Sequence, residues 1–139
     1  MRRVQRWRYY CDFCKKAGGS AGHMARHEKG CTANPFRICG ICKHAETIPE
    51  PLPKLIEFVK LHCEPVNDLP EGVDPYSTIG KEELQALRQL ADGCPACMFA
   101  ALRQAKTFTD QTAQFDFKAE LKSVWDNIND ARSASEHYG

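Results

Sequence analysis

The amino-acid sequence predicts a mostly α-helical protein whose helical body is stapled by zinc. Two observations lead to this prediction. Apolar residues recur at the three-and-four spacing of a helix in four segments between residues 52 and 128. Six of the eight cysteines form three CxxC pairs, the spacing with which one tight turn points two sulfurs at one ion. A chain of 139 residues makes one ordinary domain or two very small ones, which excludes a multidomain enzyme.

The N-terminal sequence MRRVQRWRYYCDFC is basic, but no apolar segment follows it, so we expect no secretory signal. No apolar run approaches the roughly 18 residues that a membrane-spanning helix needs, and we expect no membrane partner. These features predict a reducing compartment. Clustered cysteines in such a compartment hold a metal more often than they form disulfides.

Charge divides the chain into two parts. Residues 1–44 carry ten Lys or Arg and two acidic residues, a net charge of +8, whereas residues 45–139 carry a net charge of −7. This asymmetry indicates nucleic acid or another acidic partner at the basic end, although the basic end could instead fold against the acidic one. Arginines alternate with aromatic residues at the N-terminus, which suits phosphate contact and stacking on unpaired bases. The residues of this pattern are Arg2, Arg3, Arg6, Trp7, Arg8 and Tyr10.

The same division predicts two domains. Residues 1–44 hold the basic arm and a zinc module, and residues 45–139 form an acidic helical domain joined to it through a second zinc site. Residues 45–54, AETIPEPLPK, contain three prolines and predict an extended connector. Residues 64–80 contain three prolines and two glycines and predict a long surface loop.

Four helices follow from the apolar spacing. The first covers residues 52–63, and the second covers residues 81–93, where Gly93 supplies the stop. The third begins at CPAC with Pro95 in its first position. The fourth follows Asp116, a suitable N-cap residue. Its apolar stripe consists of Phe117, Leu121, Val124, Trp125 and Ile128.

The first candidate metal site lies in the segment YYCDFCKKAGGSAGHMARHEKGC. Cys11 and Cys14 are followed by twelve residues and His27, and by three more residues and Cys31. A knuckle supplies two thiolates, and a helix supplies two ligands one turn apart. An alternative pairs His23 with His27 and leaves Cys31 free. We prefer Cys31, because the eight residues between Cys14 and His23 are short for a hairpin tip and the first helical turns.

This segment resembles the Cys-Cys-His-Cys variant of the classical ββα zinc finger, over about residues 7–31. The resemblance implies a bend at Gly18 and Gly19 and a helix capped by Ser20. Gly18 stands where the family has its central aromatic residue, and Phe13 is the candidate to fill that gap.

The family reads base edges from the start of its helix and from the third and sixth helical residues. By resemblance, Ser20, His23 and Arg26 are the candidate base-contacting residues, and His23 and Arg26 are suitable donors to guanine. Both could equally be ordinary exposed helix residues. One finger spans only about three base pairs, so a single finger with a basic arm implies weak specificity, structure-selective binding or protein contact.

The two remaining CxxC pairs predict a second site. Cys39, Cys42, Cys94 and Cys97 together make a closed four-cysteine zinc site, which has no open position for a catalytic water. Such a site would hold the basic residues 1–44 against the helical domain of residues 45–139. Cys94 and Cys97 also lie at a predicted helix start, where the helix dipole favours thiolates.

Three other residues compete for this second site. Cys63 lies on the apolar stripe of its helix, so we interpret it as a small core residue before a ligand. His44 and His62 are expected on the surface, although His44 could replace a cysteine ligand. A redox role for CPAC would need a preceding strand in a βαβ unit, and none is predicted before Cys94.

The sequence contains no Walker loop, GxSxG or HExxH motif, so we expect no enzyme. Its segments CDFCKKxGGS, HMxRHExxC, NPxRxCxxC and CPACMxAALRQ are similar to small zinc-finger proteins of phage and bacterial genomes that have no assigned function. This resemblance implies the cytoplasm of a bacterial host cell rather than a nucleus. We therefore expect a zinc-binding protein with two structural zinc ions that binds DNA or RNA, or acts as an accessory protein. The alternative is a protein-interaction module, such as a phage-encoded modulator or inhibitor of a larger host complex.

Overall fold

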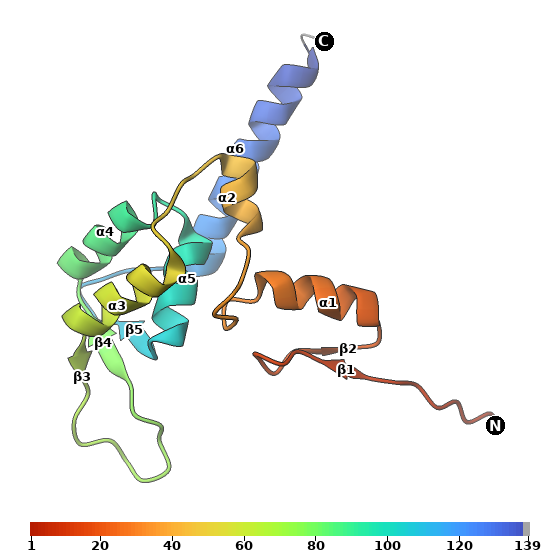
Figure 1. Ribbon diagram of the computed structural model, residues 1–139, viewed down its shortest axis with the longest axis horizontal. Helices are drawn as coiled ribbons and strands as arrows, with labels where there is room; N and C mark the ends of the chain where they lie inside the picture. Colours follow the sequence, from red (N-terminus) through yellow and green to blue (C-terminus); the bar gives the residue numbers. More distant parts are fainter. Residues whose placement is uncertain (138–139) are drawn as a thin grey trace.

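The computed structural model describes the backbone of residues 1–137 and the side chains of residues 1–130. Within this part the chain forms six helices and five short strands, which confirms the mostly α-helical class. Residues 1–8 form an extended arm that leads into a small front module, defined here as residues 9–31 (Figure 1). None of the described helices is long and apolar enough to cross a membrane.

The front module consists of a hairpin and one helix. Strand β1 (Tyr9–Tyr10) pairs antiparallel with strand β2 (Ala17–Gly18), and helix α1 (Ala21–Gly30) follows. Ser20 caps α1 as predicted, because its hydroxyl accepts a hydrogen bond from the His23 amide at 3.3 Å. The cap fixes where the helix starts and therefore which of its residues face the hairpin.

A turn and a short helix connect the front module to the rest of the chain. Asn34 is buried, and its side chain donates to the Glu28 carbonyl at 2.7 Å and accepts from the Phe36 amide at 2.8 Å. Helix α2 (Gly40–Ala45) then begins with Cys39 as its N-cap. Helix α2 was not predicted, because its six residues are too few to show a helical period.

The helical body contains the four predicted helices: α3 (Leu52–His62), α4 (Lys81–Leu90), α5 (Pro95–Gln104) and α6 (Phe117–His137). Pro95 stands in the first turn of α5, where its missing amide costs no hydrogen bond. Asp116 caps α6 by accepting from the Ala119 amide at 3.2 Å. Both features match the sequence prediction.

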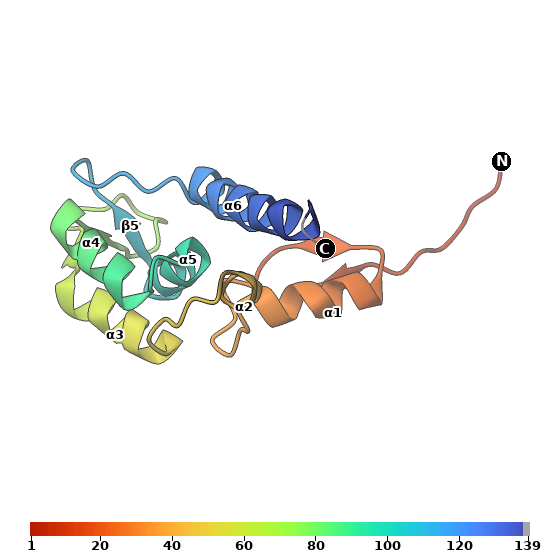
Figure 2. The same cartoon turned by 90° about the horizontal axis from the view of Figure 1, so that it is seen from above.

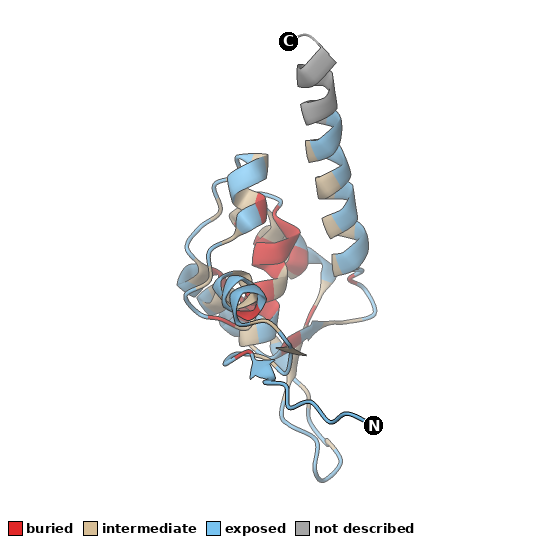
Figure 3. Cartoon of the chain, turned by 90° about the vertical axis from the view of Figure 1, so that its right-hand side faces the viewer, coloured by how far each residue is buried: buried red, intermediate tan, exposed pale blue. Residues whose placement is uncertain are grey.

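Helix α5 lies at the centre of the core and contacts α3, α4 and α6. Most of its residues are buried, and Figure 3 shows the buried residues gathered in the middle of the helical body. Ile41 of α2 belongs to this same core. The buried side chains include Leu55, Val59, Ile79, Leu84, Leu87, Met98 and Leu102.

A small sheet lies at the end of the helical body. Strand β3 (Glu64–Pro65) pairs antiparallel with β4 (Ser77–Ile79), and β4 pairs in parallel with β5 (Thr107–Thr109). The predicted loop over residues 64–80 was therefore wrong at its two ends. Strands of two or three residues are too short to produce a detectable alternation of apolar and polar positions.

The predicted connector is also shorter than expected. Helix α2 ends where Glu46 adopts a left-handed conformation with φ 57°, and α3 begins at Leu52 with Pro51 as its N-cap. Pro53 therefore lies in the first turn of α3 rather than in the connector. Proline is tolerated there, because the amides of the first helical turn have no hydrogen-bond acceptor within the helix.

Figure 2 shows α2 lying between α1 and the helical body.

Candidate metal centres

The eight predicted ligands form two clusters. Within each cluster the candidate ligand atoms all lie within 4.8 Å of one another. The first cluster contains Cys11, Cys14, His27 and Cys31, and the second contains Cys39, Cys42, Cys94 and Cys97. None of the eight cysteines is in a disulfide.

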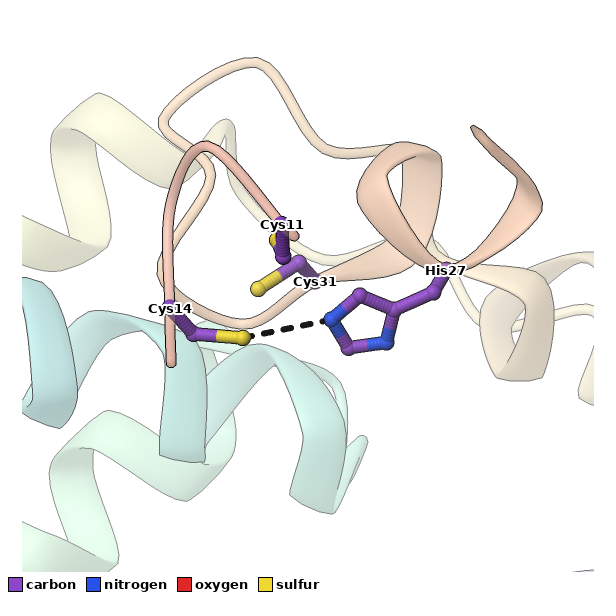
Figure 4. Close-up of side chains that lie close together, drawn as sticks. All are labelled: Cys11, Cys14, His27 and Cys31. Carbon is purple, nitrogen blue, oxygen red and sulfur yellow. Dashed lines mark hydrogen bonds between the residues drawn. The ribbon is translucent and has the colours of Figure 1, made fainter. Parts of the chain in front are cut away.

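The first centre lies between the hairpin and α1. Cys11 follows β1, Cys14 lies in the hairpin turn, and His27 and Cys31 lie one turn apart at the C-terminal end of α1 (Figure 4). The Cys14 Sγ and His27 Nε2 atoms are 3.3 Å apart. Zinc bonds of about 2.3 Å to sulfur and about 2.0 Å to nitrogen in a tetrahedron place the two ligand atoms about 3.5 Å apart. The observed spacing therefore fits a tetrahedral zinc ion.

Backbone amides point at the sulfurs of this knuckle. The Phe13 amide donates to Cys11 Sγ at 3.4 Å, and the Lys16 amide donates to Cys14 Sγ at 3.5 Å. Burial raises the pKa of Cys14, but the hydrogen bonds from Lys16 and His27 outweigh it and lower this pKa to about 6. The hairpin is therefore shaped to present a thiolate, which is the form that binds zinc.

The structure selects between the two assignments of the fourth ligand. Cys31 is buried in the cluster, and this burial raises the pKa of its thiol. His23 is exposed, and its Nδ1 atom lies 3.0 Å from an Arg26 guanidinium nitrogen. Cys31 and not His23 therefore completes the first cluster.

The front module has almost no core apart from its ligands. Cys11, Met24 and Cys31 are its buried residues, with Ala33 packed beside them. Phe13 is 39% exposed, so the prediction that it fills the gap at Gly18 was wrong. Burial of one methionine contributes about 1.5 to 3 kcal/mol, whereas structural zinc contributes about 10 to 16 kcal/mol in finger peptides. Metal binding therefore dominates the stability of this module.

The second centre joins two distant segments. Cys39 and Cys42 lie at the start of α2, and Cys94 and Cys97 lie at the start of α5. Cys39 Sγ is 3.6 Å from Cys94 Sγ, and Cys42 Sγ is 3.5 Å from Cys97 Sγ. Two sulfurs bound to one tetrahedral zinc are about 3.8 Å apart, whereas a disulfide bond is about 2.05 Å long. The spacing fits a shared zinc ion.

Crowding of the four thiols makes their ionisation unequal. Hydrogen bonds from Cys94 and Cys97 hold the pKa of Cys39 well below its usual range. The neighbouring Cys39 sulfur raises the pKa of Cys94 to about 12, and it raises the pKa of Cys97 as well. Four sulfurs this close can all ionise only when a cation offsets their mutual repulsion, which is the role of zinc in a four-cysteine site.

Arg37 lies between the two centres. Its Nε atom donates to the Gly30 carbonyl at the end of α1 at 3.2 Å, and one terminal nitrogen lies 3.9 Å from Cys97 Sγ. Gln104 of α5 donates to the carbonyls of Thr32 and Asn34, both at 3.0 Å. The end of the front module is therefore attached to the helical body beside the second centre.

The three competing residues lie outside both clusters. The Cys63 thiol donates to the Lys60 carbonyl at 3.6 Å and is only half-buried, so it is neither a ligand nor a deeply buried core residue. His62 contacts the Phe58 ring, with 4.4 Å between the ring centroids. His44 lies against Trp125 of α6, with 5.6 Å between centroids.

A redox role for the CPAC segment requires a strand of a βαβ unit directly before Cys94. A strand does precede it, because β4 lies before α4 and pairs in parallel with β5 after α5. Cys94, however, follows the turn at the end of α4 rather than a strand. Its thiol, like that of Cys97, faces the sulfurs of the other CxxC pair.

The candidate nucleic-acid residues occupy two places on the surface. All of the arm, including Arg2, Arg3, Arg6 and Arg8, is exposed. His23 and Arg26 are exposed on α1, whereas the Ser20 hydroxyl is occupied as the helix cap.

The zinc assignment is based on the ligand types and distances in this chain and not on similarity to known proteins. Comparisons with protein-family models, curated proteins and solved structures returned no match, so the similarity to phage and bacterial zinc-finger proteins stays a prediction. The two clusters themselves are consistent with two zinc ions.

Proposed function

We propose that this chain is a zinc-binding protein that binds nucleic acid, or serves as an accessory protein on it, and that both zinc ions are structural. Two observations taken together support this proposal: residues 1–44 carry a net charge of +8, and the arm that holds four of their arginines is fully exposed. The arm presents its arginines, Trp7 and Tyr10 to solvent beside a metal-anchored helix. Arginines contact phosphates, and exposed aromatic rings stack on unpaired bases.

Within this proposal, residues 7–31 are a Cys-Cys-His-Cys variant of the ββα finger. The order of hairpin and helix and the position of the four ligands support this assignment. His23 and Arg26 lie on the exposed side of α1, where they contact each other and where a base edge could take the place of that contact. Ser20 acts through its cap and orients the helix.

Neither zinc is proposed to be catalytic. Each cluster offers four protein ligands, which leaves no coordination position for water or substrate. The eight reduced thiols suit a reducing cytoplasm. The protein is therefore proposed to act by binding rather than by catalysis.

The test is a titration with single-stranded and duplex oligonucleotides at two salt concentrations. If about six cations meet phosphates, the log of affinity falls with log salt at a slope of roughly 5. Affinity then decreases about a thousandfold between 50 and 200 mM salt. A quadruple variant with Arg2, Arg3, Arg6 and Arg8 changed to Gln should weaken every sequence alike and flatten the slope.

A matched control removes the same charge from the helical body. Lys54, Lys60, Lys81 and Lys122 are exposed, and their combined replacement by Gln should leave the slope unchanged. Absence of oligonucleotide binding near 50 mM salt would reject nucleic-acid binding. An equal effect of the two quadruple variants would show attraction by net charge rather than by the arm.

A second candidate function has its own observation. Phe36 and Ile38 are 86% and 70% exposed on the segment that joins the two centres. Neighbouring apolar side chains in solvent favour contact with a protein. The alternative is therefore a protein-interaction module, such as a phage-encoded modulator of a larger host complex. A pull-down from bacterial host extract with wild-type protein and a Phe36→Ser, Ile38→Ser variant tests it, because a specific partner is lost only with the variant.

A further inference from the structure

An aromatic groove lies on the helical body, and none of the eight candidate metal ligands lines it. Its volume is about 1010 Å³, and it is bounded by β4, β5, the segment before β4 and one side of α5. Side chains that contribute to its lining include Tyr76, Phe99, Arg103, Lys106, Phe108 and Phe115. No local sequence pattern indicates this groove, because its aromatic residues are widely separated along the chain.

The aromatic rings of the groove offer flat apolar surface to a ligand. Phe108 of β5 is 62% exposed although it stands next to the core. The Tyr76 and Phe108 rings form a T-shaped pair, with 5.3 Å between centroids and 88° between the ring planes. Phe99 is held by stacking on Phe117 of α6 at 4.4 Å. Contact with Tyr76 therefore steadies the Phe108 ring, while the exposed part of this side chain can stack on a planar ligand.

Charge distinguishes this groove from the rest of the helical body. Residues 45–139 carry a net charge of −7, but Arg103 and Lys106 are both exposed at the groove, against the single acidic residue Asp74. A ring-shaped ligand that carries a negative charge matches this combination of aromatic rings and cations. A nucleotide has both properties, since its base stacks and its phosphate pairs with a cation.

The groove is also connected to the basic end of the chain. Arg103 donates to the Thr32 hydroxyl at 3.0 Å, and Thr32 follows the last ligand of the first centre. A cation of the groove therefore contacts the segment that leads out of α1. One strand of nucleic acid could extend from the front module to the groove over this contact.

We propose that the groove binds an unpaired base of single-stranded nucleic acid, with Phe108 as the stacking platform and Arg103 and Lys106 at the adjacent phosphates. This inference rests on the proposed nucleic-acid function and adds a second contact to it. A base that is paired in a duplex cannot stack on Phe108, because its faces are already covered by its neighbours. The groove therefore makes the protein prefer single strands.

The test compares three substitutions of one exposed residue. Phe108→Ala and Phe108→Leu both remove the aromatic ring, and Leu keeps much of the apolar volume, whereas Phe108→Tyr keeps the ring. Affinity is measured for a labelled oligothymidylate of about twelve nucleotides and for the same strand paired with its complement. Ala and Leu should each weaken single-strand binding about 5- to 150-fold, the effect of losing one stacked base. Tyr should bind as the wild type does.

Two controls separate stacking from other effects. Duplex affinity and the salt slope should be unchanged in all three variants, because no charge is removed. Ile48→Ala deletes another exposed apolar side chain outside the groove and should leave single-strand affinity unchanged. Circular dichroism and zinc content should match the wild type for every variant, because Phe108 is exposed.

The outcomes distinguish the failure of this inference from the failure of the proposed function. If the wild type binds neither oligonucleotide, both proposals fail. If it binds with the expected salt slope but Phe108→Ala and Phe108→Leu bind the single strand as tightly as wild type, only the groove proposal is overturned. A groove that binds a peptide would give this second result. Equal weakening of duplex and single strand would also overturn the proposal.

Discussion

The two metal centres have similar ligands, but they stabilise two regions of the molecule in different ways. The first draws all its ligands from residues 11–31, and these ligands form most of the core of the front module. The second draws its ligands from two segments of the chain and adds to a core that already contains α3, α4 and α5. Zinc replaces a hydrophobic core in the front module, whereas in the helical body it fastens one segment to an existing core.

This difference predicts unequal responses to metal removal. A strong chelator should unfold the front module, because about 10 to 16 kcal/mol of apparent zinc binding exceeds what Met24 contributes. The helical body should keep α3 to α6, since its buried side chains stay packed. Metal analysis of the untreated protein should give two equivalents of zinc, and amide NMR dispersion before and after chelation reports each part separately. One equivalent, or an iron-sulfur absorption band, would contradict the assignment of the clusters.

Substitution of single ligands should separate the centres. Cys31→Ser and Cys94→Ser should each lower the zinc count by one, and each should leave the other centre filled. Cys31→Ser should unfold only residues 9–31, whereas Cys94→Ser should release α2 from α5 and destabilise the helical body. Zinc analysis and thermal unfolding measure these effects.

Substitutions of a histidine and a cysteine that lie outside both clusters serve as controls for these variants. His23→Ala and Cys63→Ala should keep both zinc ions, because neither side chain lies in a cluster. Loss of zinc in His23→Ala together with full zinc in Cys31→Ser would reverse the assignment of the fourth ligand.

Acid should also affect the second centre more steeply. Zinc competes with protons for thiolates, and the second centre has four thiols where the first has three and an imidazole. Each centre has one thiol with a lowered pKa, which is about 6 for Cys14 and lies well below its usual range for Cys39. Zinc must displace protons from the two other thiols of the first centre and from the three others of the second, among them Cys94, whose pKa is raised to about 12. The log of apparent zinc affinity should therefore rise by about one unit more per pH unit at the second centre. Chelator competition on Cys31→Ser and Cys94→Ser, each with one centre left, measures both slopes, and equal slopes would contradict this expectation.

The smallest expected effect concerns the two helix caps. Ser20→Ala removes the cap of α1 and should cost about 1 kcal/mol, which appears as about fivefold weaker zinc binding at the first centre. Asp116→Ala removes the cap of α6 and should lower the stability of the helical body by a similar amount. Neither variant should affect the other region. Coupling between them would show that the two parts unfold as one unit.

Much of the helical body and both ligand sets could be predicted from the sequence. Helices α3 to α6 are long enough to show an apolar period. The Asp116 cap was predicted from its residue type, and the Ser20 cap from the resemblance to a zinc finger. The ligands of the first centre follow from local spacing. Those of the second followed because only two CxxC pairs were left to share a metal.

The features that were missed depend on contacts between distant residues. The strands β3 to β5 are two or three residues long and exist because the ends of a loop meet the segment after α5. Phe13 was the candidate to fill the gap that the finger resemblance leaves at Gly18, but it is 39% exposed and lies outside the small core of the front module. The groove depends on Tyr76 and Phe108 meeting across the β4–β5 pair, which no local pattern encodes.

The chain separation at the second centre has a consequence for synthesis of the protein. The first centre has all its ligands once Cys31 has left the ribosome, but the second must wait for Cys97, 66 residues later. At elongation rates of about 5 to 20 residues per second, this delay lasts roughly 3 to 13 s. During that interval Cys39 and Cys42 lack their partner thiols, whereas the first centre already has all four of its ligands. The first centre can therefore bind its zinc ion before the thiols that complete the second centre have emerged.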